Sequence, residues 1–288
     1  MTELVTQASV ISEKGQDNII KTKKGRIKIA AKSKSAFVIK LTIISLVLLT
    51  ILGFLTFDYR DVDIMAAIKA TLHNIKLVFG EPHLIYNTGI GALKALLTTF
   101  CLGVLATIFG AIIAFFGALL CAKNIANPMV ANIVKSCVAF IRAVPTILWV
   151  LIFTIAAGLG SVAAVAGLTF HSAGYLTKAY AESIEEIDSG TIEALKAGGA
   201  GYWQIVFQAI IPSSLSYMTA WTFLRFEINF TNAIAMGAAA GAGGIGYDLF
   251  MAGSFYFDLR ELGFVTYIIV ISVIILEIIA TKVKEKVS

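Results

Sequence analysis

Long stretches of apolar side chains, nearly free of charges, are the feature of this sequence that most restricts its fold. Hydrophobic residues make up 58% of the 288 residues and charged residues 14%, whereas about a quarter of a soluble domain is charged. A helix crosses the hydrocarbon core of a bilayer with about 20 mainly apolar residues and satisfies its own backbone hydrogen bonds there. The sequence therefore predicts an all-α integral membrane protein.

Six segments are predicted as membrane-spanning helices. The apolar block at 133–180 is too long for one span, so we divide it at Gly158-Leu159-Gly160, its only turn signal. The predicted spans are Phe37–Phe57, Lys94–Leu120, two helices within Ile133–Tyr180, Ser214–Met236 and Gly263–Thr281.

The charges predict the orientation of these spans. The whole net charge of +5 lies within residues 1–35, directly before the first span, and basic segments stay on the cytoplasmic side of a membrane. We expect this tail to lie near anionic lipid headgroups rather than to bind nucleic acid. Six spans then place both termini and residues 181–213 in the cytoplasm, with 58–93 and 237–262 outside.

The first outer segment contains a second kind of helix. Ile64, Ile68, Leu72, Ile75 and Phe79 recur at helical spacing, which indicates either a helix lying in the membrane interface or one packed on the spans. Residues 36–93 thus form the first span with this segment, and 94–285 form the main transmembrane domain.

The predicted cytoplasmic segment at 182–212 resembles a short helix-turn-helix outside the membrane. After the turn at Asp188-Ser189-Gly190, Ser189 or Thr191 is able to cap a helix that contains Glu193–Ala197. Gly198-Gly199-Ala200-Gly201 ends that helix, Tyr202–Ile211 forms another, and Pro212 marks the start of the fifth span. Such an element buries little by itself and is well placed to dock on a partner.

This segment carries a specific resemblance. Glu193-Ala194-Leu195, followed by Gly199-Ala200 and ending at Ile211-Pro212, resembles the EAA loop of bacterial ABC importer permeases, although Leu195 and Ala209 depart from the common pattern. The resemblance implies a coupling helix seated on a separate ATPase subunit. Glu193 would pair with a basic group of that subunit, and Gly199 would form the turn.

Further motifs resemble the phosphonate-type (PhnE-like) permeases over about residues 90–285. They are Arg142-Ala143-Val144-Pro145-Thr146, His171-Ser172-Ala173-Gly174, Ala181-Glu182-Ser183-Ile184-Glu185, Arg225-Phe226-Glu227-Ile228-Asn229 and Gly241-Ala242-Gly243-Gly244-Ile245-Gly246. The resemblance implies a location in the bacterial cytoplasmic membrane, two ATPase subunits and an extracytoplasmic substrate-binding protein. We expect a homodimer, because one such chain cannot supply both halves of the pathway. ATP would bind to the ATPase chains, so no cofactor is expected here.

Ionisable and polar side chains within the spans are candidates for the translocation path. Arg225 and Glu227 lie within the fifth span together with Asn229, and His171 lies in the fourth. A charge at bilayer depth costs about 2.5–3.5 kcal/mol, so it faces a partner or a water-filled path. Either a pore-lining role or a structural network of ion pairs and hydrogen bonds fits these residues. A lone histidine among small residues favours an interhelical hydrogen bond.

The glycine-rich run at Gly241, Gly243, Gly244 and Gly246 is not a nucleotide loop. It follows a membrane helix, whereas a phosphate-binding loop follows a strand, and no Walker A pattern occurs elsewhere. Small residues there allow close backbone approach or a bend, and the resemblance places them near the outer gate. The cysteines at 101, 121 and 137 lack metal-ligand spacing and are expected to pack in the apolar segments.

Two other classes of protein are weighed against an ABC permease. A secondary transporter would show inverted repeats with broken helices, and a membrane-embedded enzyme would group His, Asp, Glu or Ser at a membrane face. The sequence shows neither pattern. The resemblance favours phosphonates as the solute, with phosphite, phosphate or another small solute left open.

Overall fold

The computed structural model describes residues 34–56 and 63–287. The chain divides into two compact units, Met1–Ala67 and Ile68–Ser288, which are described separately. Most of the predicted basic tail, the last residue of the first predicted span and the acidic residues Asp58 and Asp61 lie outside the described residues.

The first unit contains α2 (Lys34–Thr56), which is the first predicted span. The side chains of Phe37–Thr56 are all exposed within the unit, as expected of a helix surrounded by lipid. Its threonine hydroxyls, such as that of Thr50 on the carbonyl of Leu46, donate hydrogen bonds to the preceding turn. Polar side chains satisfied in this way are tolerated in an apolar helix.

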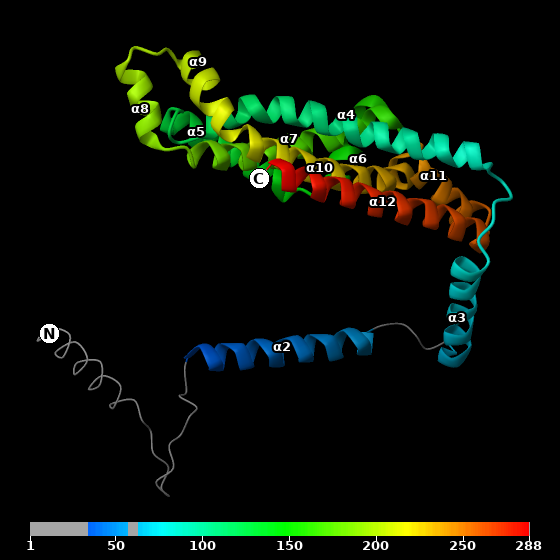
Figure 1. Ribbon diagram of the computed structural model, residues 1–288. Coiled ribbons are helices and arrows are strands. Elements are labelled where there is room, and N and C mark those ends of the chain that lie inside the picture. Colours follow the sequence, from blue (N-terminus) through cyan, green and yellow to red (C-terminus); the bar gives the residue numbers. More distant parts are fainter. Residues whose placement is uncertain (1–33, 57–62, 288) are drawn as a thin grey trace, which may run out of the picture. The chain divides into compact units, whose positions relative to one another are not determined.

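The second unit is a bundle of helices (Figure 1). The elements are α3 (Ile64–Gly80), α4 (Gly89–Cys121), α5 (Pro128–Ala143), α6 (Thr146–Ala157), α7 (Ser161–Glu185), α8 (Ser189–Ala197), α9 (Tyr202–Ile205), η1 (Val206–Ile210), α10 (Ile211–Ala240), α11 (Ile245–Phe250), η2 (Met251–Phe255) and α12 (Leu259–Val287). α3 begins in the first unit. Every regular element in the described ranges is helical, so the prediction of an all-α membrane protein is confirmed.

All six predicted spans are helical, but they differ in apolarity. Among the described residues, α2, α4 and α12 are long and apolar enough to cross a membrane, and two bent helix pairs raise the number to five. α7 is not among these helices, since it carries small and polar residues such as Gly167, His171 and Ser172 in its middle and charged residues near its end. α7 also buries fourteen residues against its neighbours, so it does not depend on a lipid-facing apolar surface.

The division of the 133–180 block was wrong in one respect. The predicted loop at Gly158-Leu159-Gly160 exists, with positive φ angles at both glycines, but Pro145 introduces another break. α5 and α6 meet there at 93°, because a proline forces the preceding residue into extended backbone, as at Val144. The indole nitrogen of Trp149 donates to the carbonyl of Ile141 across the bend at 2.9 Å.

Pro212 lies at the start of the fifth span, as predicted, and the predicted helix before it continues into that span. The helix runs without interruption from Tyr202 to Ala240, and Pro212 lies in the first turn of α10. The preceding turn is a π-helix, in which the Ile211 N–H donates to the carbonyl of Val206. A π turn accommodates a residue that cannot donate to the carbonyl four positions earlier.

Small residues bring α7 into close contact with its neighbours. A Cβ atom at Gly110 of α4 would lie 2.7 Å from Ser172 Cβ, and one at Gly167 would lie 2.5 Å from the Cα of Val150 in α6. Helix association inside a membrane depends on such close packing, because lipid is as apolar as the side chains. α7 therefore lies at the centre of the bundle.

Polar contacts join the start of α12 to the segment between α3 and α4. The buried carboxylate of Glu261 accepts hydrogen bonds from the N–H groups of Ile85 and Tyr86 at 3.2 and 2.8 Å. Arg260 pairs with Glu81 at 2.8 Å. α3 buries none of its residues, although the Tyr267 hydroxyl donates to its Phe79 carbonyl. Both interpretations of α3 thus stay open.

The contact between Gly167 and Val150 leads to a testable prediction. We expect Gly167→Ala to destabilise the protein by about 1–3 kcal/mol, the usual cost of overpacking, because the added methyl group meets the backbone of α6. The measurement is thermal unfolding of the purified full-length protein in detergent, with a lower midpoint expected.

The matched control is Gly53→Ala in α2, where an added Cβ meets nothing within 4 Å. Alanine is the better helix former, so this variant is expected to keep or slightly raise the midpoint. An unchanged midpoint for Gly167→Ala would contradict the prediction, because it would mean that α6 and α7 can move apart to admit the methyl group without loss of stability.

Candidate functional site

A network of polar side chains crosses the middle of the bundle. The Asn229 side chain donates to Thr107 Oγ1 at 2.9 Å and lies 3.0 Å from the Ser172 hydroxyl. Arg225 Nε donates to that same hydroxyl at 2.9 Å. Arg225 and Asn229 are four residues apart, so they share one face of α10. The network thus joins α4, α7 and α10, with apolar clusters on either side of it.

Arg225 is a buried cation without a carboxylate partner. Its residue is 2% exposed, and it belongs to none of the three ion pairs found among residues 34–56 and 63–287. Its guanidinium instead lies 5.1 Å from the ring centre of Tyr175, and its hydrogen bonds go to neutral groups. A buried charge without an opposite charge beside it is poorly compensated.

The arrangement also defines the state of His171. Arg225 NH2 donates to His171 Nδ1 at 2.8 Å, and the Thr146 hydroxyl lies 3.1 Å from the same nitrogen. Because a guanidinium has donors only, Nδ1 accepts and the ring is neutral with its proton on Nε2. His171 therefore adds no positive charge to the network.

Glu227 lies apart from the other three predicted pathway residues. It is half-buried on a different face of α10, as expected for residues two apart on a helix. The structure therefore brings together His171, Arg225 and Asn229, while Glu227 forms no ion pair in the described part of the chain.

The predicted coupling loop forms a compact projection at one end of the bundle (Figure 1). Asp188 caps α8 by accepting from the Thr191 N–H at 3.2 Å, so the predicted caps Ser189 and Thr191 were wrong. Ile192 is 2% exposed and packs into the apolar cluster at this end. Glu193 and Ala194 are exposed. α8 is therefore anchored by one face and offers the other to a partner.

Gly199 forms the turn after α8, as predicted. Its φ is +83°, its N–H donates to the carbonyl of Lys196, and the N–H of half-buried Ala200 donates to that of Leu195. This pair of bonds is a Schellman motif, which places a left-handed residue after a helix end and favours glycine. Pro212 lies farther along, after the π turn.

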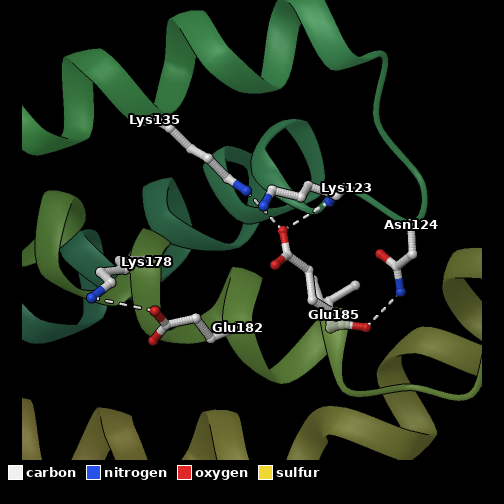
Figure 2. A network of polar contacts seen from close by, with 7 residues as sticks. Lys123, Asn124, Lys135, Lys178, Glu182 and Glu185 are labelled. Atoms are coloured by element: carbon white, nitrogen blue, oxygen red, sulfur yellow. Dashed lines mark hydrogen bonds and ion pairs between the residues drawn. The ribbon is translucent and has the colours of Figure 1, made fainter.

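A cluster of charges lies where α7 leads into this loop (Figure 2). The Glu185 carboxylate accepts from Lys135 Nζ at 2.8 Å and from the Lys123 backbone N–H at 2.9 Å. Glu185 lies beyond Tyr180, where the predicted span ends. Partial burial raises the pKa of its carboxyl, but these bonds outweigh burial and hold the pKa below its ordinary value. Lys178 pairs with Glu182 at 3.3 Å.

Three of the predicted outer-gate glycines lie in the connection between α10 and α11, and Gly246 lies in α11. Gly241, Gly243 and Gly244 have φ angles of +61°, +78° and +75°, which favour glycine. The helices on either side differ in direction by 51°. A Cβ atom at Gly246 would collide with the carbonyl of Ile234. The run therefore provides both the bend and the close approach expected of it, at the end of α10 remote from α8.

Sequence reasoning missed several members of these sites. Thr107 and Tyr175 were not predicted, because a hydroxyl in an apolar helix usually bonds within its own helix, and Thr146 was noted only as part of a family motif. Lys123, Lys135 and Lys178 were missed because they are far apart in sequence. The spacing of Arg225 and Asn229 is the one local signal that points to a shared polar face.

Three relatives with known transport roles resemble this chain. The phosphate-import permease protein PhnE of Mycolicibacterium smegmatis is 32% identical over 163 residues, 56% of this chain and 30% of the relative. The phosphite transport system permease protein PtxC of Stutzerimonas stutzeri is 31% identical over 158 residues, 54% and 57% of the two chains. The methionine import system permease protein MetP of Bacillus subtilis is 28% identical over 160 residues, 53% and 71%. The match thus spans less than two thirds of the first two relatives, and all three are permeases rather than enzymes.

Two solved structures share the fold. The inward-facing MetNI methionine ABC transporter aligns with a TM-score of 0.61 at 24% identity and covers 68% of this chain and 95% of its own. A bacterial ABC transporter involved in the import of the acidic polysaccharide alginate aligns with a TM-score of 0.58 at 13% identity, covering 88% and 98%. The fold is that of ABC importer permeases.

The family comparison covers more than half of the sequence. The model of the binding-protein-dependent transport system inner membrane component matches residues 107–283, which include the polar network, the projection at α8 and the glycines at 241–246. By this match, the chain belongs to the family of binding-protein-dependent transport system inner membrane components.

Proposed function

We propose that this chain is the membrane-spanning permease subunit of an ATP-driven ABC importer that carries a phosphorus oxyanion into the bacterial cytoplasm. Family membership supports the permease role. The observation that carries the substrate class is Arg225, a buried cation whose hydrogen-bond partners are neutral. Phosphonate, phosphite and phosphate share the negative tetrahedral oxygens that a guanidinium binds well. Among these three anions, we propose phosphonate as the substrate.

The permease needs a second copy of the chain to complete the path. We propose a homodimer, in which helix movements of the two chains open the region of Arg225 to one side of the membrane and then to the other. In the closed bundle Arg225 is 2% exposed, so an anion reaches it only when helices separate. The glycine run at 241–246 would face the substrate-binding protein on the outer side, with both termini in the cytoplasm.

Coupling to ATP hydrolysis would take place at α8. The exposed face with Glu193 and Ala194 would contact a separate ATPase subunit, while buried Ile192 holds the helix to the bundle. ATP would bind only to that subunit. A movement of α8 would reach α9 through the turn at 198–201 and then pass along the continuous helix from Tyr202 to Ala240. This arrangement links the ATPase to the helix that carries Arg225.

The first prediction concerns the coupling surface. We expect Glu193→Ala to lower energy-dependent uptake and the stimulation of the ATPase by about tenfold, since it removes one charge-assisted contact with a partner. Glu193 is exposed, so the variant should fold normally. Uptake in cells and ATPase activity of the purified complex are the measurements.

The matched control is Glu186→Ala, which removes an exposed carboxylate just before α8. We expect wild-type transport from it. Wild-type uptake together with normal ATPase stimulation in Glu193→Ala would refute the coupling role of that residue.

The second prediction separates charge from hydrogen bonding at Arg225. Gln at this position keeps hydrogen-bond donors but lacks the charge. Lys keeps the charge but lacks the planar guanidinium that binds two oxygens at once. We expect Arg225→Gln to lower oxyanion uptake about tenfold or more, and Arg225→Lys to retain a larger share. Size-exclusion profiles check that both variants fold.

The decisive assay is uptake of labelled aminoethylphosphonate, phosphite and phosphate, with and without the gene, under phosphorus starvation. Gene-dependent uptake of one of these anions supports the proposal and identifies the substrate. If Arg225→Gln transports it as the wild type does, Arg225 does not act on the substrate. If none of the three depends on the gene, the phosphorus assignment is lost.

A further inference from the structure

The cytoplasmic end of the bundle contains a second concave site that the transport path does not use. A cavity of about 320 Å³ lies between the end of α4, α5 and α7, and six charged side chains line it. These are Lys123, Lys135, Arg142, Lys178, Glu182 and Glu185. We propose that this cavity binds a phosphate-type oxyanion, either a free ion or a lipid headgroup.

The charge balance of the cavity favours an anion. Lys135 is paired with Glu185 at 2.8 Å and Lys178 with Glu182 at 3.3 Å. Lys123 and Arg142 have no carboxylate partner within 4.0 Å among the residues that the structure describes. Two positive charges are therefore left over, and a dianion balances them. Glu185 Oε1 accepts from the Lys135 ammonium and from the Lys123 backbone N–H (Figure 2), so Lys135 is the one cation with which Glu185 forms an ion pair among the described residues.

The shape and exposure of the site suit a small ligand. Pockets that bind small molecules measure about 300–1,000 Å³, and this cavity lies at the lower end of that range. The side chains of Lys123 and Arg142 are exposed, so they can turn toward a ligand without breaking the bundle. Arg142 also lies 5.9 Å from the Tyr175 ring centre, which holds it beside the cavity.

The cavity is separate from the Arg225 network, although one residue lies near both. The Tyr175 ring contacts Arg225 as well as Arg142, yet neither Tyr175 nor Arg225 lines the cavity. Glu185, which does line it, lies three residues before the Asp188 cap of α8. An anion bound here therefore sits at the base of the coupling loop.

The test uses the full-length protein in nanodiscs of neutral phosphatidylcholine. Equilibrium dialysis with labelled inorganic phosphate at low salt gives the affinity. We expect Lys123→Gln combined with Arg142→Gln to weaken binding about tenfold or more, because each residue supplies a charge-assisted contact. The matched control, Lys69→Gln with Lys94→Gln, removes two exposed charges elsewhere and should bind as the wild type does. Arg225→Gln should also keep this binding.

A second arm distinguishes the two sources of the oxyanion. Nanodiscs that contain phosphatidylglycerol are studied by native mass spectrometry without added phosphate. If the protein retains this lipid and loses it when Lys123 and Arg142 are substituted, the occupant is a lipid headgroup. If the first arm shows phosphate binding that depends on the same residues, the occupant is a free ion.

The proposal is overturned if the paired Lys123 and Arg142 substitutions leave both phosphate binding and lipid retention unchanged. It is also overturned if phosphate binding disappears only in Arg225→Gln, a result that would support the transport proposal instead. The two proposals therefore succeed or fail separately.

Discussion

The close approach of α7 to α4 and α6 is the contact on which the rest of the bundle depends. Gly110, Gly117 and Gly167 leave no room for a side chain at these crossings. Helices in lipid gain little from apolar contact alone, so they associate where backbones can come near each other. The same small residues that allow this approach place the hydroxyl of Ser172 within reach of both Arg225 and Asn229.

This packing explains how one helix can be both central and polar. α7 carries His171 and Ser172 in its middle and three charged residues near its end, a composition that is costly in contact with lipid. The surrounding helices bury Ser172 and half-bury His171, with apolar clusters on either side of this polar layer, while Lys178 and Glu182 are exposed and pair with each other. Hydrogen bonds in such layers average only about 0.6 kcal/mol each. The layer therefore sets the alignment of the helices more than it stabilises them.

The sequence predicted what depends on local composition. Apolar length located helices at all the predicted spans, and the glycines at 158–160, 198–201 and 241–246 identified the turns, because glycine acts on the backbone over a few residues. The bend at Pro145 was missed since the apolar pattern continues across it. The cap by Asp188 was missed because three neighbouring residues can all cap a helix. The partners of Arg225 could not be predicted, as the contacts join residues 53 and 54 positions apart.

The π turn at Val206–Ile210 fixes the rotational phase between the coupling loop and the polar layer. An α-helix advances 3.6 residues per turn, so losing the extra residue of a π turn rotates everything beyond it by about 100°. Such a rotation would carry Arg225 away from His171 while α9 stayed in place. Pro212 opposes that change, because its ring clashes with the carbonyl four residues earlier in a regular helix. One proline thus keeps the two ends of a long helix in register.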